Sequence, residues 1–395
     1  MPKHSRVARK VPGLSSTQGG RAVDNYREVF VGIDTSKSRN AIAFAEAGRR
    51  GEVRFFGEID NTHDATRKLV AKLTPRYQKL HFCYEAGPTG YGLHRWLINL
   101  GQSCDVVAPS LIPTRPGDHV KTNRRDAEVL AKLLRAGELT AVWVPDTQHE
   151  AIRDLVRARE AAVRDLRAKR QQVTSFLLRH SRHFPGRTAW SKAHARWLAE
   201  QKFEHHAHHL VLQEGIGAVR DAGERIVRIE KAIVELASQW SLAPVVNAIQ
   251  AMRGIGFIAA VTILAEIGDL SRFDNPRQLM GYLGLTPSED STGDSIRRGG
   301  ITKAGNGRVR RILVESAWTY RFPARIGAAK LAKIEGLPKP VVDIAWKAQT
   351  RLCARYRALV AKGKKPTVAV TAIAREMAAF IWAIAGEVRA PQAAA

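Results

Sequence analysis

Long apolar runs and cysteines are both scarce in this sequence. Only three cysteines occur in 395 residues, without the paired short spacing that a disulfide framework or a zinc site needs. They suit a reducing cytoplasm. No apolar run reaches the roughly 18 residues of a membrane-spanning helix, because Arg375 and Glu376 interrupt the best candidate, at 367–385. The sequence therefore predicts a cytoplasmic protein with no membrane segment.

Acidic residues are too few to balance the basic ones. The chain has 63 Lys and Arg against 37 Asp and Glu, a formal net charge of +26. This excess is larger than solubility requires, and a polyanionic partner is its simplest cause. Residues 1–27 are basic and lack the apolar stretch of a signal peptide. We expect a disordered tail there that attracts phosphate, or else a solvated arm without a role.

Short runs rich in Val, Ile and Phe dominate the next part of the chain. They alternate with segments of helical periodicity. Strands are predicted at 28–34, 40–47, 52–59, 80–85 and 104–109, and helices at 61–75, 90–101 and 122–136. Three strands followed by alternating helices and strands are typical of an α/β domain built on a mixed sheet. We expect this domain to span 28–146.

From residue 147 the sequence changes to long, charged helical segments. Apolar residues at three- and four-residue steps over 147–243 favour a coiled coil between chains or an antiparallel helical hairpin within one chain. The pattern does not choose between them, because a bundle core has nearly the same spacing. A mainly helical domain rich in Gly and Arg is expected at 244–325, followed by a helical tail at 326–395.

Two acids end predicted strands, and a third lies in the first turn of a predicted helix. Asp34 ends VGID, Glu85 ends CYE, and Asp126 follows the helix start near 122. Acids at strand ends can meet at one edge of a sheet. Two or three oxygen ligands there would suit Mg²⁺ or Mn²⁺. Each acid alone is better explained as a solvated or capping residue, but the combination in so basic a chain favours a metal site.

A second candidate site is the segment 284–311, where Ser288, Ser291 and Ser295 lie among glycines and basic residues. A serine that attacks a phosphodiester needs a base or metal, and positive charge around the phosphate. The residues that would supply this charge are Arg297, Arg298, Lys303, Arg308, Arg310 and Arg311. Composition alone favours a basic loop that grips phosphate without chemistry.

Two glycines upstream mark a tight turn before an apolar helix. Gly254 and Gly256 in MRGIGFIAA would let backbone N–H groups approach a phosphate. A purely structural turn is the alternative.

At these residues the sequence resembles the DEDD-type insertion-sequence transposases, whose N-terminal domain is similar to the Holliday-junction resolvase RuvC. The resemblance covers about residues 28–320 and rests on VGIDTSK, YEAGPTGYGL, HVKTNRRDAEVLAKLLRAGELTAVWVPD, MRGIGFIAAVTILAEIGD, FDNPRQLMGYLGLTPSEDSTG and GGITKAGNGRVRRILVE. It implies an RNase H-like (RuvC-like) fold, a coiled-coil segment and a helical C-terminal domain with a nucleophilic serine. It also implies DNA as substrate, a structured noncoding guide RNA, a dimer or tetramer, and a place at the prokaryotic nucleoid.

Carried over by position, the resemblance assigns Asp34 and Glu85 to the first two acids of the motif and Asp126 to the fourth. Ser291, in the Ser-Thr-Gly step, best matches the nucleophile. Arg124 and Arg125, beside Asp126, are expected to bind nucleic acid.

The third acid of the motif is replaced by Asn123, three residues before Asp126 and so on the same helical face. An amide oxygen can touch a hard cation but brings no charge. Either the metal site is weaker, or Asn123 orients a water. Asp118, outside the motif, is a possible substitute.

The sequence thus predicts a transposase-like recombinase that cuts and rejoins DNA through a covalent phosphoserine at Ser291, assisted by the metal of the acids. Two alternatives stay open. One is a junction-resolving nuclease in which metal-activated water attacks, and the other is an inactive relative that only binds nucleic acid.

Overall fold

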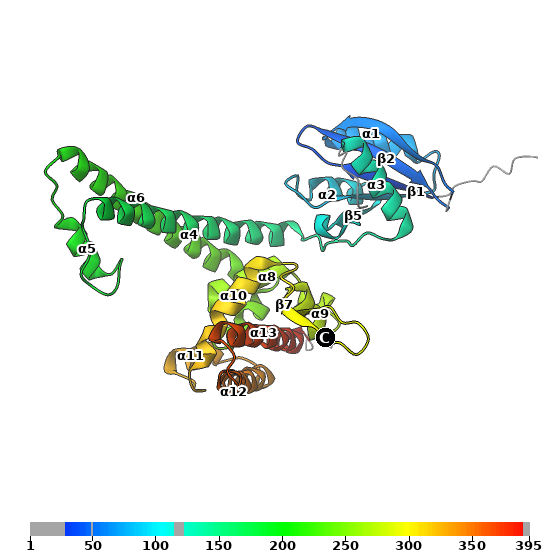
Figure 1. The fold of residues 1–395 in the computed structure, drawn as a ribbon. Helices are drawn as coiled ribbons and strands as arrows, with labels where there is room; N and C mark the ends of the chain where they lie inside the picture. The colour runs from blue at the N-terminus through cyan, green and yellow to red at the C-terminus, as the bar shows by residue number, and fades with distance from the viewer. Residues whose placement is uncertain (1–27, 49, 114–121, 390–395) are drawn as a thin grey trace, which may run out of the picture. The chain divides into compact units, whose positions relative to one another are not determined.

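The computed structural model describes residues 28–48, 50–113 and 122–389 (Figure 1). It divides into two compact units, Met1–Val144 and Pro145–Ala395. The predicted disordered tail, 1–27, and Asp118 lie outside the described residues.

The first unit is built on a five-stranded mixed sheet with helices on its faces (Figure 1). The strands are β1 (Glu28–Asp34), β2 (Arg39–Glu46), β3 (Val53–Asp60), β4 (Lys79–Glu85) and β5 (Ser103–Val107). The helices are α1 (His63–Leu73), α2 (Gly92–Asn99), the short turn η1 (Pro109–Leu111) and α3 (Asn123–Ala136). The strand order is β3-β2-β1-β4-β5, with β1 antiparallel to β2 and parallel to β4. The predicted mixed α/β domain is confirmed.

Side chains along β1 point alternately to the two faces of the sheet. Val31 and Ile33 join the core formed with α1 and α2. Gly32 points to the other face, where a Cβ would collide with the backbone oxygen of Ala127 and the backbone nitrogen of Ala131. Only glycine allows α3 to lie this close to the strand.

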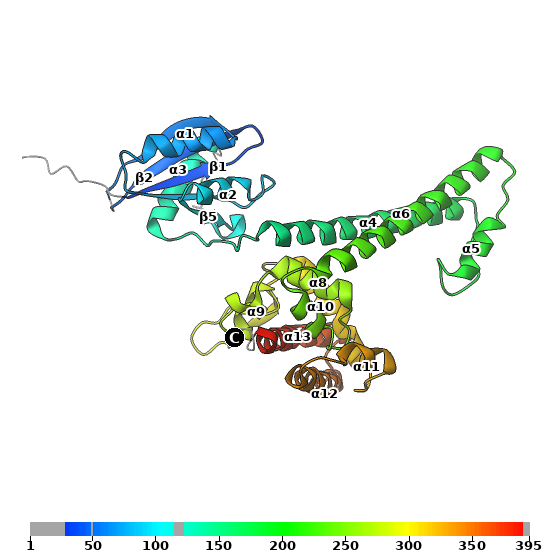
Figure 2. The same ribbon diagram turned by 180° about the vertical axis from the view of Figure 1, so that it is seen from behind.

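Two long antiparallel helices, α4 (Thr147–Arg179) and α6 (His206–Ser238), begin the second unit. They lie side by side in both views (Figures 1 and 2). Ion pairs cross the seam, Arg159 with Glu230 at 2.6 Å and Arg225 with Asp165 at 3.1 Å. The structure therefore places the helical hairpin within one chain, which is one of the two arrangements that the periodicity allows. The connection carries α5 (Lys192–Ala199).

The rest of the second unit is mainly helical, with one small β-hairpin. The elements are α7 (Ala243–Ile249), α8 (Phe257–Ile267), η2 (Leu270–Arg272), α9 (Pro276–Tyr282), β6 (Pro287–Glu289), β7 (Arg298–Ile301), α10 (Gly307–Ala317), η3 (Trp318–Arg321), α11 (Ala328–Ile334), α12 (Lys339–Ala361) and α13 (Pro366–Arg389). The predicted helical character of this region is confirmed.

Helix α13 lies in the centre of this core. Ile373, Met377 and Ile384 are fully buried in the same cluster as residues of α8 and α10. The helix is long and apolar enough to cross a membrane, but half of that apolar window is buried against its neighbours, as in a core helix. Helices α12 and α13 share this core with helices that precede residue 326, because α13 packs against α7, α9 and α10, which cover its apolar residues.

Candidate functional sites

Asp34 and Glu85 end two adjacent parallel strands, and β1 and β4 stay paired to within one residue of both acids. Gly32 lies against α3, and the Cys83 thiol donates to the Leu130 carbonyl of α3 at 3.7 Å. Since side chains alternate along a strand, Asp34 and Glu85, two residues further on, also face α3. Both acids therefore lie on one face and at one edge of the sheet.

Helix α3 brings Asp126 and Asn123 toward the same edge. Thr122 caps the helix and accepts a hydrogen bond from a backbone N–H of its first turn at 3.3 Å, which sets where the helix begins. Ala127, the next residue after Asp126, is the one that lies against Gly32 of β1. The first turn of α3 is therefore held beside the end of β1, where Asp34 lies.

The donors at this edge are carboxylate and amide oxygens, the ligand type that Mg²⁺ and Mn²⁺ prefer. Within the part of the chain that the structure describes, no three His, Cys, Asp or Glu side chains are grouped so as to hold a metal ion. The fold thus directs Asp34, Glu85 and Asp126 to one edge without gathering them into a ligand cluster. The chemistry of the donor set fits a divalent cation, and the predicted role of these residues stays a prediction.

The β6–β7 hairpin has a closed, rigid base. Gly284 and Gly305 both adopt left-handed backbone conformations, with φ of 61° and 64°. A Cβ on either would collide with the backbone of the opposite segment. Arg310 of α10 closes the base, because its Nη1 donates to the carbonyls of Leu283 and Ala304 at 2.9 and 2.8 Å.

Ser291 lies in the exposed turn of this hairpin, and its hydroxyl is held. Its Oγ donates to Glu289 Oε1 at 3.0 Å, and Arg298 Nε donates to Oε2 of the same carboxylate at 3.2 Å. Glu289 and Arg298 are partners across the two strands. The hydrogen bond from Ser291 and the Arg298 guanidinium keep the pKa of Glu289 below its usual value. Ser288 differs, because its Oγ donates to the Gly300 carbonyl at 3.1 Å.

Sequence reasoning did not single out Glu289. The signal that could have found it is its spacing of two from Ser291, which puts both on one side of an extended segment.

The six basic residues predicted to contact phosphate fall into three pairs. The first pair stabilises the hairpin, since Arg310 closes its base and Arg298 holds Glu289. Arg308 and Arg311 pair with Glu160 of α4 at 2.6 and 3.0 Å. Burial raises the pKa of Glu160, but both arginines outweigh it and hold the pKa below its usual value.

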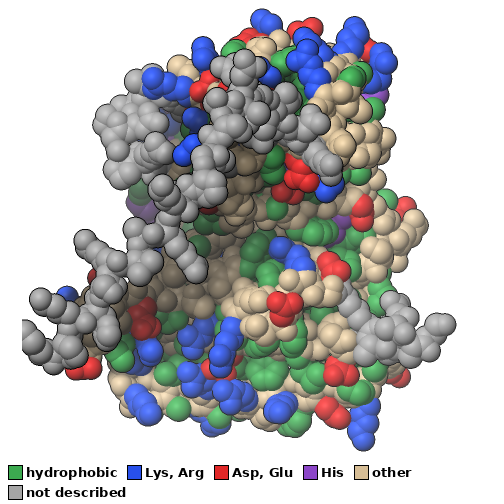
Figure 3. All heavy atoms as spheres, turned by 90° about the vertical axis from the view of Figure 1, so that its right-hand side faces the viewer, with side chains coloured by type: hydrophobic (Ala, Val, Ile, Leu, Met, Phe, Trp, Pro, Cys, Tyr) green, Lys and Arg blue, Asp and Glu red, His purple; other side chains and the backbone are tan. Residues whose placement is uncertain are grey.

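Arg297 and Lys303 are exposed, and neither has an acidic partner within 4.0 Å among the described residues. Of the six basic residues predicted to contact phosphate, these two have a side-chain charge that a ligand can reach. In Figure 3, Lys and Arg side chains, in blue, occur on both the upper and the lower parts of the face drawn.

A further acid that sequence reasoning missed is Glu266 of α8, which is buried. Asn306, the N-cap of α10, donates to its Oε2 at 2.9 Å, and Arg157 of α4 donates to both of its oxygens. The sequence feature that could have identified Glu266 is the presence of an acid inside the apolar run of α8. This contact ties the helical hairpin to the segment that carries β7 into α10.

Gly254 has a left-handed φ of 82°, and a Cβ there would lie 2.6 Å from the backbone oxygen of Ser316. This glycine is therefore needed for packing on the end of α10. Gly256 is the N-cap of α8, and a Cβ there would meet open space. Phosphate binding at this turn stays a prediction.

Arg124 pairs with Glu128 one turn along α3, at 3.0 Å. Its guanidinium also lies over the Phe55 ring, 5.5 Å from the ring centre. Arg125 is exposed in the same turn. Both residues lie on the helix that carries Asp126, and their contact with nucleic acid stays a prediction.

Two family models match separate parts of the chain. The model described as the transposase IS116/IS110/IS902 family matches residues 246–329, and a transposase model of the DEDD, IS110 type matches residues 31–181. The second match contains the acids of the sheet edge, and the first contains Ser291. The chain belongs to this family of insertion-sequence transposases, as the sequence resemblance predicts.

Individual relatives agree with this assignment. The protein y4qE of Sinorhizobium fredii is 58% identical over 94% of this chain and 92% of its own length. The transposase for insertion sequence element IS1533 of Leptospira borgpetersenii is 31% identical over 86% of this chain and 99% of its own. The transposase for insertion sequence element IS1328 of Yersinia enterocolitica is 26% identical over 67% of this chain and 80% of its own.

Proposed function

We propose that this transposase cuts and rejoins DNA through a covalent phosphoserine formed by Ser291. The observation that carries the proposal is the placement of this hydroxyl. It lies in the exposed turn of a hairpin whose base is clamped, and it is held by a carboxylate that Arg298 in turn holds. A positioned hydroxyl next to open basic residues has what attack on a phosphodiester needs.

In the proposed reaction, the bond from Ser291 Oγ to phosphorus forms as the bond from phosphorus to a deoxyribose oxygen breaks. The departing oxygen takes up a proton, and the serine proton passes to solvent. Glu289 is a weak base because its pKa is lowered, so it orients the hydroxyl. The serine ester keeps the energy of the broken phosphodiester, and a new deoxyribose hydroxyl can therefore displace Ser291 without ATP.

We further propose that Asp34, Glu85 and Asp126 bind a divalent cation, Mg²⁺ or Mn²⁺. Three acids at one edge support this, as does the match to a DEDD-type model, since that domain is associated with divalent metals. A bound cation would neutralise charge that develops on the phosphate. The arrangement of three antiparallel strands followed by two parallel ones supports an RNase H-like (RuvC-like) fold for this unit.

The acids and Ser291 belong to different units of the chain. We therefore propose a homo-oligomer, a dimer or tetramer, in which the reacting phosphate meets both. DNA is the proposed substrate, and a structured noncoding RNA is the proposed guide. The net charge of +26 supports two polyanionic partners.

The test is whether protein becomes covalently attached to DNA. Purified protein, cognate element ends and RNA are incubated with Mg²⁺, and the products are separated on a denaturing gel. Wild type should give a slow band that protease removes, and Ser291→Ala should give none. Ser288→Ala and Ser295→Ala are matched controls that should keep the band.

Asp34→Ala should bind nucleic acid normally but lose the band. Cleavage by Ser291→Ala without any adduct would favour the junction-resolving nuclease. Recombination by Asp34→Ala at the wild-type rate would refute the metal-site assignment.

A further inference from the structure

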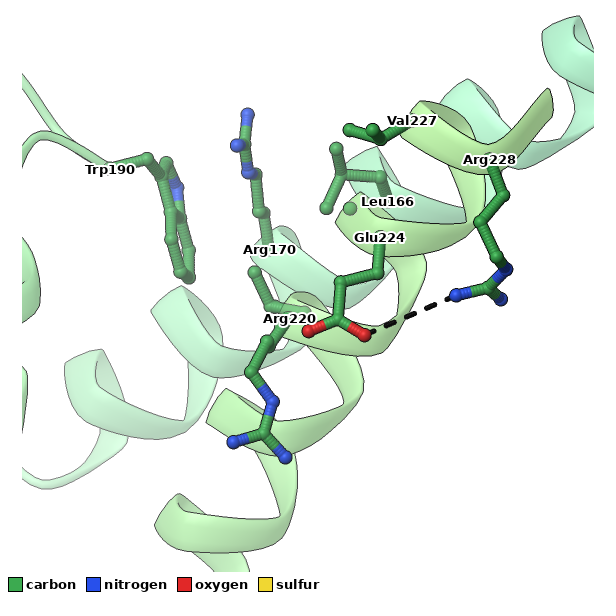
Figure 4. Close-up of a pocket in the computed structure, with 9 residues that line it drawn as sticks. Leu166, Arg170, Trp190, Arg220, Glu224, Val227 and Arg228 are labelled. Atoms are coloured by element: carbon green, nitrogen blue, oxygen red, sulfur yellow. Dashed lines mark ion pairs between the residues drawn. The ribbon is translucent and has the colours of Figure 1, made fainter. Parts of the chain in front are cut away.

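We infer that a pocket on the helical hairpin binds one nucleotide of single-stranded nucleic acid, with the base on Trp190 and the phosphate on the neighbouring arginines. The pocket has a volume of about 690 Å³ and lies between α4, α6 and the segment before α5 (Figure 4). Small-ligand sites usually measure roughly 300–1,000 Å³. None of its lining residues belongs to the sheet edge or the β6–β7 hairpin. The inference takes its class of partner from the proposed function.

Trp190 is held in an unusual conformation. Its φ of 61° lies in the left-handed region that a bulky residue rarely adopts. The backbone N–H donates to His194 Nδ1 at 3.1 Å, and the two rings meet edge to face with centres 5.1 Å apart. Residues kept in such conformations cluster at binding sites. The strained backbone and the His194 contact together present the indole to the pocket.

Arg170 of α4 supplies a donor that lacks a partner. Its guanidinium carbon lies 5.3 Å from the centre of the Trp190 ring, and Figure 4 shows its side chain standing beside that ring. The Nε atom is buried and has no hydrogen-bond partner among the described residues. A buried donor without an acceptor is unfavourable, and turning the Arg170 guanidinium onto a phosphate in the pocket would remove that cost.

The charge of the pocket is positive. Arg170, Arg220 and Arg228 line it, with Glu224 as the acid among the lining residues. Glu224 pairs with Arg228 at 4.0 Å, as the dashed line in Figure 4 marks. Among the described residues, Arg220 pairs with Asp221 alone, in an exposed contact at 3.6 Å. The guanidinium of Arg170 on α4 thus lies beside the indole, and Arg220 on α6 adds a second positive charge to the lining.

This combination matches the chemistry of a nucleotide. Every base offers a π-face that stacks on an indole, and guanidinium groups bind phosphate through paired hydrogen bonds. A base inside a duplex is already stacked and cannot enter, so the ligand is single-stranded. RNA and DNA share these groups, and the experiment separates them.

The experiment measures fluorescence anisotropy of labelled strands of about 20 nucleotides, as single-stranded RNA, single-stranded DNA and duplex DNA. Loss of one stacked base or its phosphate contact should weaken single-strand binding about tenfold for Trp190→Ala and Arg170→Ala. Trp190→Phe should retain most of the affinity, and duplex binding should not change. Whichever single strand loses affinity identifies the ligand.

Arg164→Ala is the matched control, since it removes an exposed arginine of α4 that does not line the pocket. If it weakens single-strand binding as much as Arg170→Ala, the effect is general charge and the inference is wrong. Unchanged affinity in both pocket variants would also overturn it.

A second measurement needs no variant, because Trp190 also packs beside the cluster around Leu198 and Leu212 and its truncation can unfold that region. Wild-type protein is irradiated with a strand carrying 5-iodouracil, and the attached peptide is sequenced. Attachment at Trp190 is expected. Attachment only elsewhere overturns the pocket, even if the Ser291 adduct still forms. Absence of both nucleic-acid binding and adduct would instead refute the proposed function together with this inference.

Discussion

The Arg157 guanidinium meets the Glu266 carboxylate at two points, with Nε 2.7 Å from Oε1 and Nη2 3.0 Å from Oε2. The Glu266 side chain is 1% exposed and the Arg157 side chain 43%. Burial would raise the pKa of Glu266, but the hydrogen bonds from Arg157 and Asn306 outweigh it, and the pKa lies below its usual 4.5. The contact fastens α4 to α8.

Glu266→Gln should lower the free energy of unfolding by about 3 kcal/mol at neutral pH, the lower end for breaking a buried pair, because water reaches Arg157. Since the folded-state pKa is lowered, this stabilisation exists above the unfolded-state value and disappears as the pH falls through the folded value. The difference in the free energy of unfolding between wild type and variant should therefore become smaller below about pH 4. Urea unfolding at a series of pH values measures it.

Glu315→Gln is the control for that experiment. Glu315 is exposed and pairs with Arg311 at 3.7 Å along one helix, so the loss should be at most about 0.5 kcal/mol. Equal losses in the two variants would contradict the special role of Glu266.

Gly32→Ala should destabilise the first unit by about 2 kcal/mol, because the new methyl group meets the α3 backbone and the helix must move. Movement of α3 also displaces Asp126 from the edge that carries Asp34. The recombination rate should therefore fall by more than the loss of folded protein alone would cause. Thermal unfolding and a plasmid recombination assay give the two readouts. Gly92→Ala, where a Cβ meets open space, should leave both near wild type.

Glu289→Ala should slow formation of the covalent adduct about fivefold, since the lost hydrogen bond of roughly 1 kcal/mol orients the Ser291 hydroxyl. Arg298→Ala should act in the same direction through Glu289. The double variant should be no slower than the slower single one, because the residues work as one unit. Rates from quenched time courses decide this, and additive losses would show independent roles.

Asn123→Asp should lower the Mg²⁺ concentration needed for half-maximal recombination, because it restores the charge that the third position of the family motif carries. An unchanged requirement would mean that a water is the true ligand. A steep loss of activity would show that this protein depends on the amide and would contradict its description as a weakened ligand.

The first unit is largely predictable from sequence because its signals are local. A short run rich in Val, Ile and Phe predicts β1 at 28–34, where the structure has it, and the helix predicted at 122–136 is α3, which the side chain of Thr122 caps. The strand-end rule likewise directs Asp34 and Glu85 to one edge without knowledge of the sheet order.

Other features depend on partners distant in the chain. Glu266 and Arg157 are 109 residues apart, and no periodic pattern links them. The apolar residues of α13 show that it is buried, but not which helices cover it. Ser291 is recognisable by its motif, whereas its contact with Glu289 depends on the hairpin turn.

The helical hairpin of α4 and α6 extends well beyond the point at which α4 is held to α10. Glu160, which Arg308 and Arg311 hold to α10, precedes the end of α4 at Arg179 by about 28 Å at 1.5 Å per residue. If the hairpin tilted by about 10° about Glu160, the end of α4 at Arg179 would move by about 5 Å. A strand held in the proposed Trp190 pocket, whose Arg170 lies about 15 Å from Glu160 along α4, would pull on α10, and α10 closes the base of the hairpin that carries Ser291. In the proposed mechanism, mechanical load on the nucleic acid would thereby displace the Ser291 hydroxyl.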